Sequence, residues 1–233
     1  MTTILFIGFL LLMTALVVAL VQRYIGGRSA RGAEAALFVW ILYVGLLSYL
    51  GVVENVNLRP PGIAFVVVPV IVFVVIFVLR ANRFELILAT VPPWLLVAMQ
   101  TFRIGVELLL HRLWIEGIVP RMLTFRGTNL DIYVAVSAGA VAWLCNRGRA
   151  GLKLAVAWNT VGLLVLSNVV VRAVLTTPGP LNLVHTEVPN RMFGTFPFTF
   201  IPAFFVPLAV VLHVLAIRTI GIRLRLPTVA PLP

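Results

Sequence analysis

Long runs of apolar residues alternate with short polar segments along the whole chain. The runs predict membrane-spanning helices, because a helix needs about 20 apolar residues to cross the hydrocarbon core of a bilayer. Seven spans are expected, at about residues 4–21, 35–53, 62–79, 92–115, 132–145, 152–175 and 197–217. The pattern therefore predicts an all-α fold, a seven-helix transmembrane bundle that forms one domain over residues 1–233.

Prolines refine this picture of the helices. Pro92 and Pro93 are expected in the first turn of the fourth helix, because proline is tolerated there but removes a backbone hydrogen bond in a helix interior. Residues 80–91 are then interpreted as a loop or a surface helix. Three other prolines lie inside expected spans, where they are predicted to bend the helix: Pro69, Pro202 and Pro207.

The composition agrees with a protein that lies in a membrane. The chain is 61% hydrophobic and only 11% charged, and its mean hydropathy is +1.11. No water-soluble domain of this length would carry so much apolar surface. Cys145 is the single cysteine, which excludes a disulfide scaffold.

The net charge of +11 is interpreted as a topology signal. Basic residues lie mainly in the first, third and fifth loops and in the C-terminal tail, so the positive-inside rule predicts an outer N-terminus and a cytoplasmic C-terminus. We expect the lipid bilayer and no nucleic acid as a partner, and a multi-pass protein of the bacterial cytoplasmic (inner) membrane. The first apolar run lacks a basic start, which favours a retained span over a signal peptide.

The fourth expected helix carries a polar stripe of Gln100, Arg103, Glu107 and His111. Their spacings of three, four and four residues place them on one helix face. Because charges are costly in lipid, this face must look into the bundle, where Arg103 and Glu107 are expected to pair. The stripe predicts either a structural pair that fixes helix packing or a polar cavity that opens outward.

Two outer segments, residues 117–131 and 176–197, are rich in turn formers and also contain apolar residues. They are expected either to cover the cavity or to be ordinary packed loops. Further candidate ligand-binding residues in these segments and in the sixth helix are Asn129, Asp131, Asn168, His185, Glu187 and Asn190.

A metal site is considered because Glu107 and His111 have the spacing at which two side chains can share one ion. Two ligands do not complete a site, so we expect no metal and no cofactor. His213 is predicted near the cytoplasmic end of the seventh helix, too far away to join them.

Two segments resemble the central signature of a family of bacterial polytopic membrane proteins, which reads approximately R-x-P-V-E and then V-P-x-x-M-T-F-x-G-x-N-x-D-I. Here the segments are residues 103–107 and 119–132, within a resemblance that covers about residues 100–218. Gly105 replaces the proline, and Leu123 is inserted before Thr124. The resemblance implies a membrane fold and no particular activity.

Three functions remain open. The first is binding or transport of a small polar or anionic ligand, with Arg103 as charge anchor, Gln100 and Asn168 as hydrogen-bonding groups, and Glu107 with His111 as a proton-coupled pair. The second is a structural or accessory subunit whose polar stripe contacts another membrane protein. The third is an intramembrane, metal-dependent enzyme acting on a lipid through Glu107, His111 and Asp131. Phosphate-binding and nucleophile motifs are missing, so enzymatic activity stays undecided.

Overall fold

Helices make up the architecture of this protein in the computed structural model, which describes residues 1–80, 90–179 and 182–225. These residues form helices, turns and loops without a strand, so the predicted all-α fold is confirmed for them. The long elements are α1 (Thr2–Tyr24), α2 (Gly27–Tyr49), α3 (Ala64–Arg80), α5 (Pro93–Met99), α6 (Phe102–Ile115), α7 (Asp131–Leu144), α8 (Gly148–Thr176) and α9 (Val206–Arg225).

Three short elements complete the description. Two 3₁₀ turns, η2 (Arg121–Leu123) and η3 (Met192–Gly194), lie in loops, and a π-helical turn, η4 (Ile201–Phe205), leads directly into α9. Helices α3 and α7 are shorter apolar helices. Within the described ranges, five helical segments are long and apolar enough to cross a membrane: Thr2–Tyr24, Gly27–Tyr49, Pro93–Ile115, Gly148–Thr176 and Ile201–Arg225.

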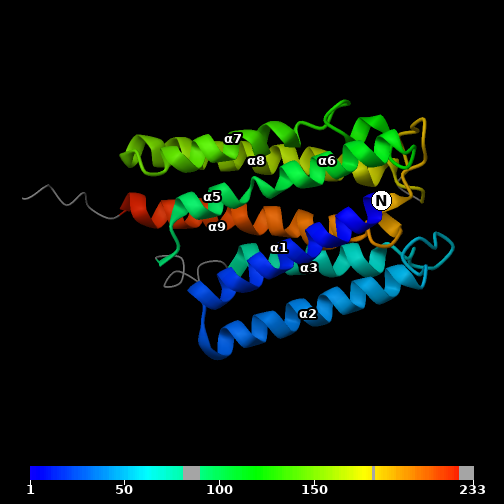
Figure 1. The fold of residues 1–233 in the computed structure, drawn as a ribbon, viewed down its shortest axis with the longest axis horizontal. Helices are drawn as coiled ribbons and strands as arrows, with labels where there is room; N and C mark the ends of the chain where they lie inside the picture. Colours follow the sequence, from blue (N-terminus) through cyan, green and yellow to red (C-terminus); the bar gives the residue numbers. More distant parts are fainter. Residues whose placement is uncertain (81–89, 180–181, 226–233) are drawn as a thin grey trace, which may run out of the picture.

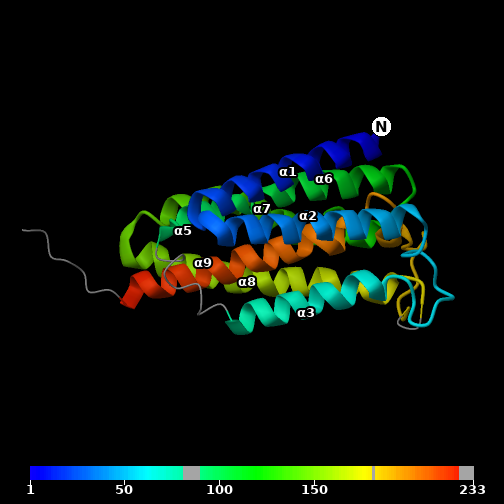
Figure 2. The ribbon, with the colours of Figure 1, turned by 90° about the horizontal axis from the view of Figure 1, so that it is seen from below.

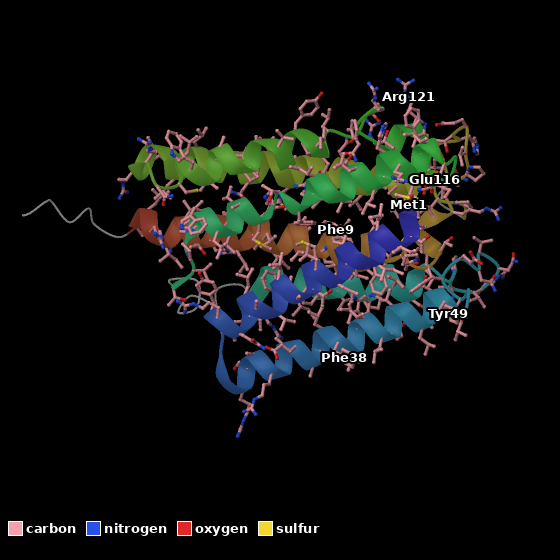
Figure 3. All side chains as sticks on the ribbon, in the orientation of Figure 1. Met1, Phe9, Phe38, Tyr49, Glu116 and Arg121 are labelled. Atoms are coloured by element: carbon pink, nitrogen blue, oxygen red, sulfur yellow. The ribbon has the colours of Figure 1, made fainter. Side chains whose placement is uncertain are left out.

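The helices lie side by side along the long axis of the molecule, with α9 between the other helices in both views (Figures 1 and 2). Helix α9 contacts α3, α5 and α8. More than half of the apolar part of α9 and of the α5–α6 segment is buried, whereas only a small part of α1 and α2 is buried. Phe38 and Tyr49 project away from the bundle on α2 (Figure 3). Exposed apolar side chains of this kind suit contact with lipid tails.

The N-terminus and the end of α9 lie at opposite ends of the bundle (Figure 1). Glu116 and Arg121, which follow α6, are at the same end as Met1 (Figure 3). This arrangement agrees with an odd number of spans. The side of the membrane on which each end lies stays a prediction from the distribution of basic residues.

Several helix bounds differ from those expected. Helix α2 begins at Gly27, not at residue 35, so Arg28 and Arg31 are helical. Helix α9 continues to Arg225, beyond the expected end at residue 217. Hydropathy detects only the apolar part of a helix, whereas the helical backbone continues through these polar extensions. The fourth span was expected from residue 92, with Pro92 and Pro93 in its first turn; helix α5 begins at Pro93, and Pro92 is its N-cap. Residues 81–89 of the adjoining segment lie outside the described residues.

Pro207 lies at the start of α9 and cannot donate a backbone hydrogen bond to the carbonyl of Ala203, four residues earlier. The indole N–H of Trp40 in α2 donates to this carbonyl instead, over 2.9 Å. In lipid a carbonyl without a partner is costly, so the neighbouring helix supplies the donor that the proline removed.

The same device recurs in α3, where Pro69 leaves the carbonyl of Phe65 without its helical donor. The hydroxyl of Tyr43 donates to that carbonyl over 3.1 Å. Trp40 and Tyr43 lie one turn apart on α2, so hydrogen bonds to two carbonyls that prolines have freed join this peripheral helix to η4 and α3. The predicted proline distortion is also seen at Pro202, which lies in the π-helical turn.

We expect Trp40→Phe to reduce the free energy of unfolding by about 1–2 kcal/mol, because it leaves the Ala203 carbonyl unpaired. In a Pro207→Ala background residue 207 regains an N–H, so the same change should cost clearly less. Denaturant titration of the purified protein in detergent measures both values, with the exposed Trp94→Phe as control. Equal costs in both backgrounds would show that the proline and the indole are not coupled.

Candidate functional site

The fourth span is broken in the middle of the bundle. Helix α5 ends at Met99 and α6 begins at Phe102, so Gln100 and Thr101 lie at the break. Arg103 follows immediately and is close to midway between the two ends of this span. With a rise of about 1.5 Å per residue, its side chain starts near the centre of the membrane.

The loop of residues 116–130, called the re-entrant loop below, folds back into the bundle after α6. Its Asn129 reaches Glu107, about two turns below the end of α6 at Ile115. Helix α7 then begins at Asp131, inside the bundle, which explains why it has only 14 residues. Such irregular backbone is tolerated at membrane depth only where protein surrounds it.

Arg103 is the centre of a buried polar cluster. Its Nε donates to Oδ2 of Asp131 over 2.6 Å, and its Nη2 donates to Oδ1 of the same carboxylate. Its Nη1 lies 2.9 Å from Nε2 of His213. The exposed fractions are 2% for Arg103 and 6% for Asp131, so the ion pair is shielded from water.

The expected pairing of Arg103 with Glu107 is therefore wrong. Helical spacing places these two side chains on one face, but a carboxylate on a facing helix can accept two parallel hydrogen bonds from the planar guanidinium. Asp131 at the start of α7 provides this geometry, and Glu107 takes a different partner.

His213 is held in one orientation by its two neighbours. Asn159 of α8 donates its amide N–H to the carbonyl of Ala155 over 2.7 Å, which turns its Oδ1 toward Nδ1 of His213, 2.8 Å away. An amide oxygen can only accept, so Nδ1 must carry the hydrogen. Nε2 then accepts from Arg103, and the imidazole in this arrangement is neutral.

The position predicted for His213, near the cytoplasmic end of its helix, is wrong. Because the segment from Ile201 runs to Arg225, His213 lies halfway along it and at the level of Arg103. The close fit also explains a glycine in α8: a Cβ atom on Gly162 would lie 2.4 Å from Cε1 of His213.

Glu107 is 1% exposed and has partners for only one of its oxygens. Its Oε1 accepts from the amide nitrogen of Asn129 over 2.6 Å, while Oε2 has no hydrogen-bond partner. Gln100 is in a similar position: its amide nitrogen donates to the carbonyl of Ala209 over 3.1 Å, and its Oε1 is buried without a partner. These acceptors lie along one stripe of the broken span, as the sequence predicted.

His111 lies one turn beyond Glu107 toward the re-entrant loop. Its ring is 4.7 Å from the ring of Phe125 and 5.3 Å from that of Trp114, measured between centroids. Its Nδ1 is buried and has no partner. The stripe thus ends in a half-buried imidazole covered by an aromatic residue of the re-entrant loop.

Residues 60–220 match the model of a domain of unknown function (DUF8737), which is more than half of the chain. The chain belongs to the DUF8737 family. The matched range contains the whole polar cluster. No curated protein and no solved structure matches the chain. The function of this DUF8737 protein therefore has to be argued from its own side chains.

The DUF8737 chain does not bring all predicted ligand-binding residues to this cluster. Asn168 is exposed on α8, where its Oδ1 accepts from Nε of Arg172 over 2.7 Å, and His185 is exposed in the second outer loop. Neither contacts Arg103 or Glu107. The helical face of Asn168 and the course of a long loop cannot be derived from residue type alone, so the sequence did not show that these two residues lie outside the cluster.

Glu187 and Asn190 also lie away from the cluster. The exposed carboxylate of Glu187 accepts from the backbone N–H of Arg121 over 2.6 Å, and the buried Asn190 donates to the hydroxyl of Thr176 over 3.0 Å. These contacts fasten the second outer loop to the re-entrant loop and to the end of α8. Both residues hold loops together and do not contact Glu107.

The cavity that was expected to open outward is not seen at Glu107, because this side chain is buried. A groove of about 280 Å³ lies elsewhere, between α1 and the α5–α6 segment, and is lined mainly by apolar residues such as Phe9 and Met13. A smaller cavity of about 50 Å³ lies at the outer loops, beside Glu54 and Arg191. Neither is lined by the residues of the polar cluster.

The metal-dependent alternative has no ready ligand set among the residues that the structure describes. No three His, Cys, Asp or Glu side chains there are grouped in a way that could hold a metal ion. Asp131 was expected to act with Glu107 and His111 in such an enzyme, but both of its carboxylate oxygens accept hydrogen bonds from Arg103.

Two members of the cluster, His213 and Asn159, were missed as site residues. Each is a polar side chain within an apolar run, and polar groups inside a membrane usually find a partner on a neighbouring helix. This signal points to them as buried partners, although it does not indicate which helix they face.

Proposed function

We propose that this protein binds or transports a small polar solute across the cytoplasmic membrane of a bacterium, with the stripe from Gln100 to His111 as its site. The observation that carries the proposal is the set of unpartnered polar atoms along this stripe: Oε1 of Gln100, Oε2 of Glu107 and Nδ1 of His111. Buried polar atoms in proteins are nearly always hydrogen-bonded, and leaving them unpaired in lipid costs free energy. A hydrogen-bonding solute would satisfy them.

The chemistry of the free atoms indicates the class of solute. The oxygens of Gln100 and Glu107 are acceptors, so a bound molecule must offer hydroxyl or amine hydrogens. The guanidinium of Arg103 already donates two hydrogen bonds to the carboxylate of Asp131, so it is not available to bind an anionic ligand. The proposal therefore moves from a polar or anionic ligand to a neutral or cationic hydrogen-bond donor.

Two discontinuities in the spans support a site that can open. The α5–α6 segment is interrupted at Gln100, and a π-helical turn precedes α9. Membrane transporters place their sites near the midplane, beside interrupted helices of this kind, and π turns recur at functional sites. We place the outer entrance beside His111, where Phe125 of the re-entrant loop covers it.

Cysteine labelling tests whether the stripe can be reached from outside. Because Cys145 is the only cysteine, Cys145→Ser gives a background without thiols. In that background we expect His111→Cys to react with a membrane-impermeant thiol reagent added to intact cells, since solute entry must expose this position intermittently. The rate is expected to lie below that of Arg126→Cys, which is exposed in the re-entrant loop.

Leu108→Cys is the matched control on the same helix, because this residue is 55% exposed but points out of the bundle toward lipid. It should stay unlabelled. If His111→Cys is as unreactive as Leu108→Cys while Arg126→Cys reacts, the proposed site is wrong. Labelling of Arg126→Cys before permeabilisation would also support the predicted outer position of the N-terminal end.

A second candidate is a structural or accessory subunit. It is favoured by one observation: Arg103, Asp131, His213 and Asn159 satisfy one another and join α6, α7, α8 and α9. A cluster of this kind can fix helix packing without any solute. Recovery of a stoichiometric membrane-protein partner after gentle solubilisation, together with no labelling at position 111, would favour this candidate.

A further inference from the structure

The carboxyl group of Glu107 is the least explained part of the cluster. We propose that Glu107 carries a proton on Oε2 in the closed conformation and exchanges it for the donor hydrogen of the incoming solute. The exchange rests on the proposed function, whereas the proton on the closed protein does not depend on it. The argument has three steps: the charges of the cluster, the hydrogen bonds of the carboxyl group and the route outward.

The charges of the cluster do not balance if both carboxyl groups are ionised. Asp131 on α7 neutralises Arg103 through two hydrogen bonds. His213 on α9 is neutral because of the hydrogen bonds described above. Glu107 would then add an unmatched negative charge in the membrane interior, where such a charge is costly.

Among the residues that the structure describes, the other elements around Glu107 offer no further positive charge. Gln100 at the break between α5 and α6 is neutral, and α1 packs against α6 with the apolar ring of Phe9 beside Gly105. The re-entrant loop supplies the side-chain amide of Asn129, which is a neutral donor. His111 is the remaining titratable group on the same face. A proton on Glu107 makes the cluster electrically neutral.

The hydrogen bonds assign this proton to one atom. The amide oxygen of Asn129 accepts from the backbone N–H of Asp131 over 2.9 Å, so its amide nitrogen must be the group that faces Glu107. That nitrogen only donates, which makes Oε1 of Glu107 an acceptor. The hydroxyl of the protonated acid is therefore at Oε2, the oxygen without a partner.

His111 provides the route between Oε2 and the outside. It lies one turn farther toward the re-entrant loop, and its Nδ1 is unpartnered. When a solute enters, the O–H bond at Oε2 breaks and the proton passes by way of this imidazole to outer water. The carboxylate that remains accepts a hydrogen bond from a cationic solute, whose positive charge replaces that of the proton. One proton leaves for each solute bound, and no oxidant, reductant or covalent intermediate is involved.

Infrared spectroscopy of the purified wild-type protein tests the proton directly. A protonated carboxylic acid has a carbonyl stretch that is separate from the bands of carboxylates and amides. We expect this band near neutral pH, and we expect it to shift when the protein is made with glutamate that carries heavy carbon in its carboxyl group. The isotope assigns the band to glutamate without any substitution, so the test does not depend on a variant that folds.

Substitutions then identify which glutamate is responsible. Glu107→Gln has the size and the neutral charge of the protonated acid, so it should fold and lose the band completely. Glu187→Gln is the control, because this carboxylate is exposed, and it should retain the band. His111→Phe should retain the band and slow its exchange in heavy water, because the route outward is removed.

Absence of the band in the wild type would overturn the proposal, including the case in which a bound sodium ion balances an ionised Glu107. Persistence of the band in Glu107→Gln would overturn it as well. The two proposals fail separately. A band from Glu107 without labelling of His111→Cys would support the protonated carboxyl group and refute the solute site. Labelling of His111→Cys without a band would support the solute site and refute the protonated carboxyl group.

Discussion

Arg103→Ala is expected to lower the free energy of unfolding by about 3–5 kcal/mol, because it leaves the carboxylate of Asp131 buried without its partner. The lost contact with His213 adds to this cost. Denaturant titration of the purified protein in detergent measures the change. A low yield of folded protein in the membrane is the corresponding result in cells.

Two comparisons show whether the cost comes from the orphaned charge. Arg103→Met combined with Asp131→Leu removes the ion pair as a unit and should recover most of the stability, because apolar replacements of buried pairs are often neutral. Arg112→Ala removes an exposed pair with Glu116, whose atoms are 3.5 Å apart, and a hydrogen bond of 2.9 Å to the hydroxyl of Thr2. It should cost about 1–2 kcal/mol. A cost for Arg103→Ala no larger than that for Arg112→Ala would contradict the assigned role of the cluster.

Gly162→Ala is expected to lower the free energy of unfolding by about 2–3 kcal/mol, through overpacking against His213. The added methyl group would lie 2.4 Å from Cε1 and 2.8 Å from Nε2 of this ring, so the imidazole must move away from Arg103. The same denaturant titration in detergent measures the loss.

Gly139→Ala provides the matched control in the neighbouring helix α7. A Cβ atom at Gly139 meets nothing within 4 Å, so alanine should be neutral or slightly stabilising there. If both glycine substitutions have the same effect, helix propensity explains the result and the close packing of His213 does not.

The sequence was sufficient to predict the bundle and one half of the polar cluster. Apolar runs indicate spans because lipid imposes a minimum length on them. The stripe from Gln100 to His111 follows from helical spacing, and Asn129 and Asp131 were recognised as polar groups in a segment that could approach it. The fold class and the residues that carry charge in the membrane were therefore accessible without coordinates.

The partners within the cluster were not accessible in the same way. Whether Arg103 pairs with Glu107 or with Asp131 depends on how far the re-entrant loop descends into the bundle, which no local pattern encodes. His213 was misplaced because hydropathy ends a helix where polar residues begin, although the helix continues to Arg225. Asn159 faces His213 because of the rotation of α8 about its own axis. A helix that is apolar on most faces gives little indication in its sequence of which face points into the bundle.

The hydrogen bonds from α2 to η4 and α3 have a consequence for how homologues that contain helix α2 vary. The indole at position 40 is needed because position 207 lacks an N–H, and the phenol at position 43 is in the same relation to position 69. In each pair the aromatic side chain bonds the carbonyl that the proline leaves without a donor, so replacing the aromatic residue alone should destabilise the protein. Among descendants of a common ancestor, loss of the proline should precede or accompany loss of its aromatic donor, and the two columns of an alignment should covary.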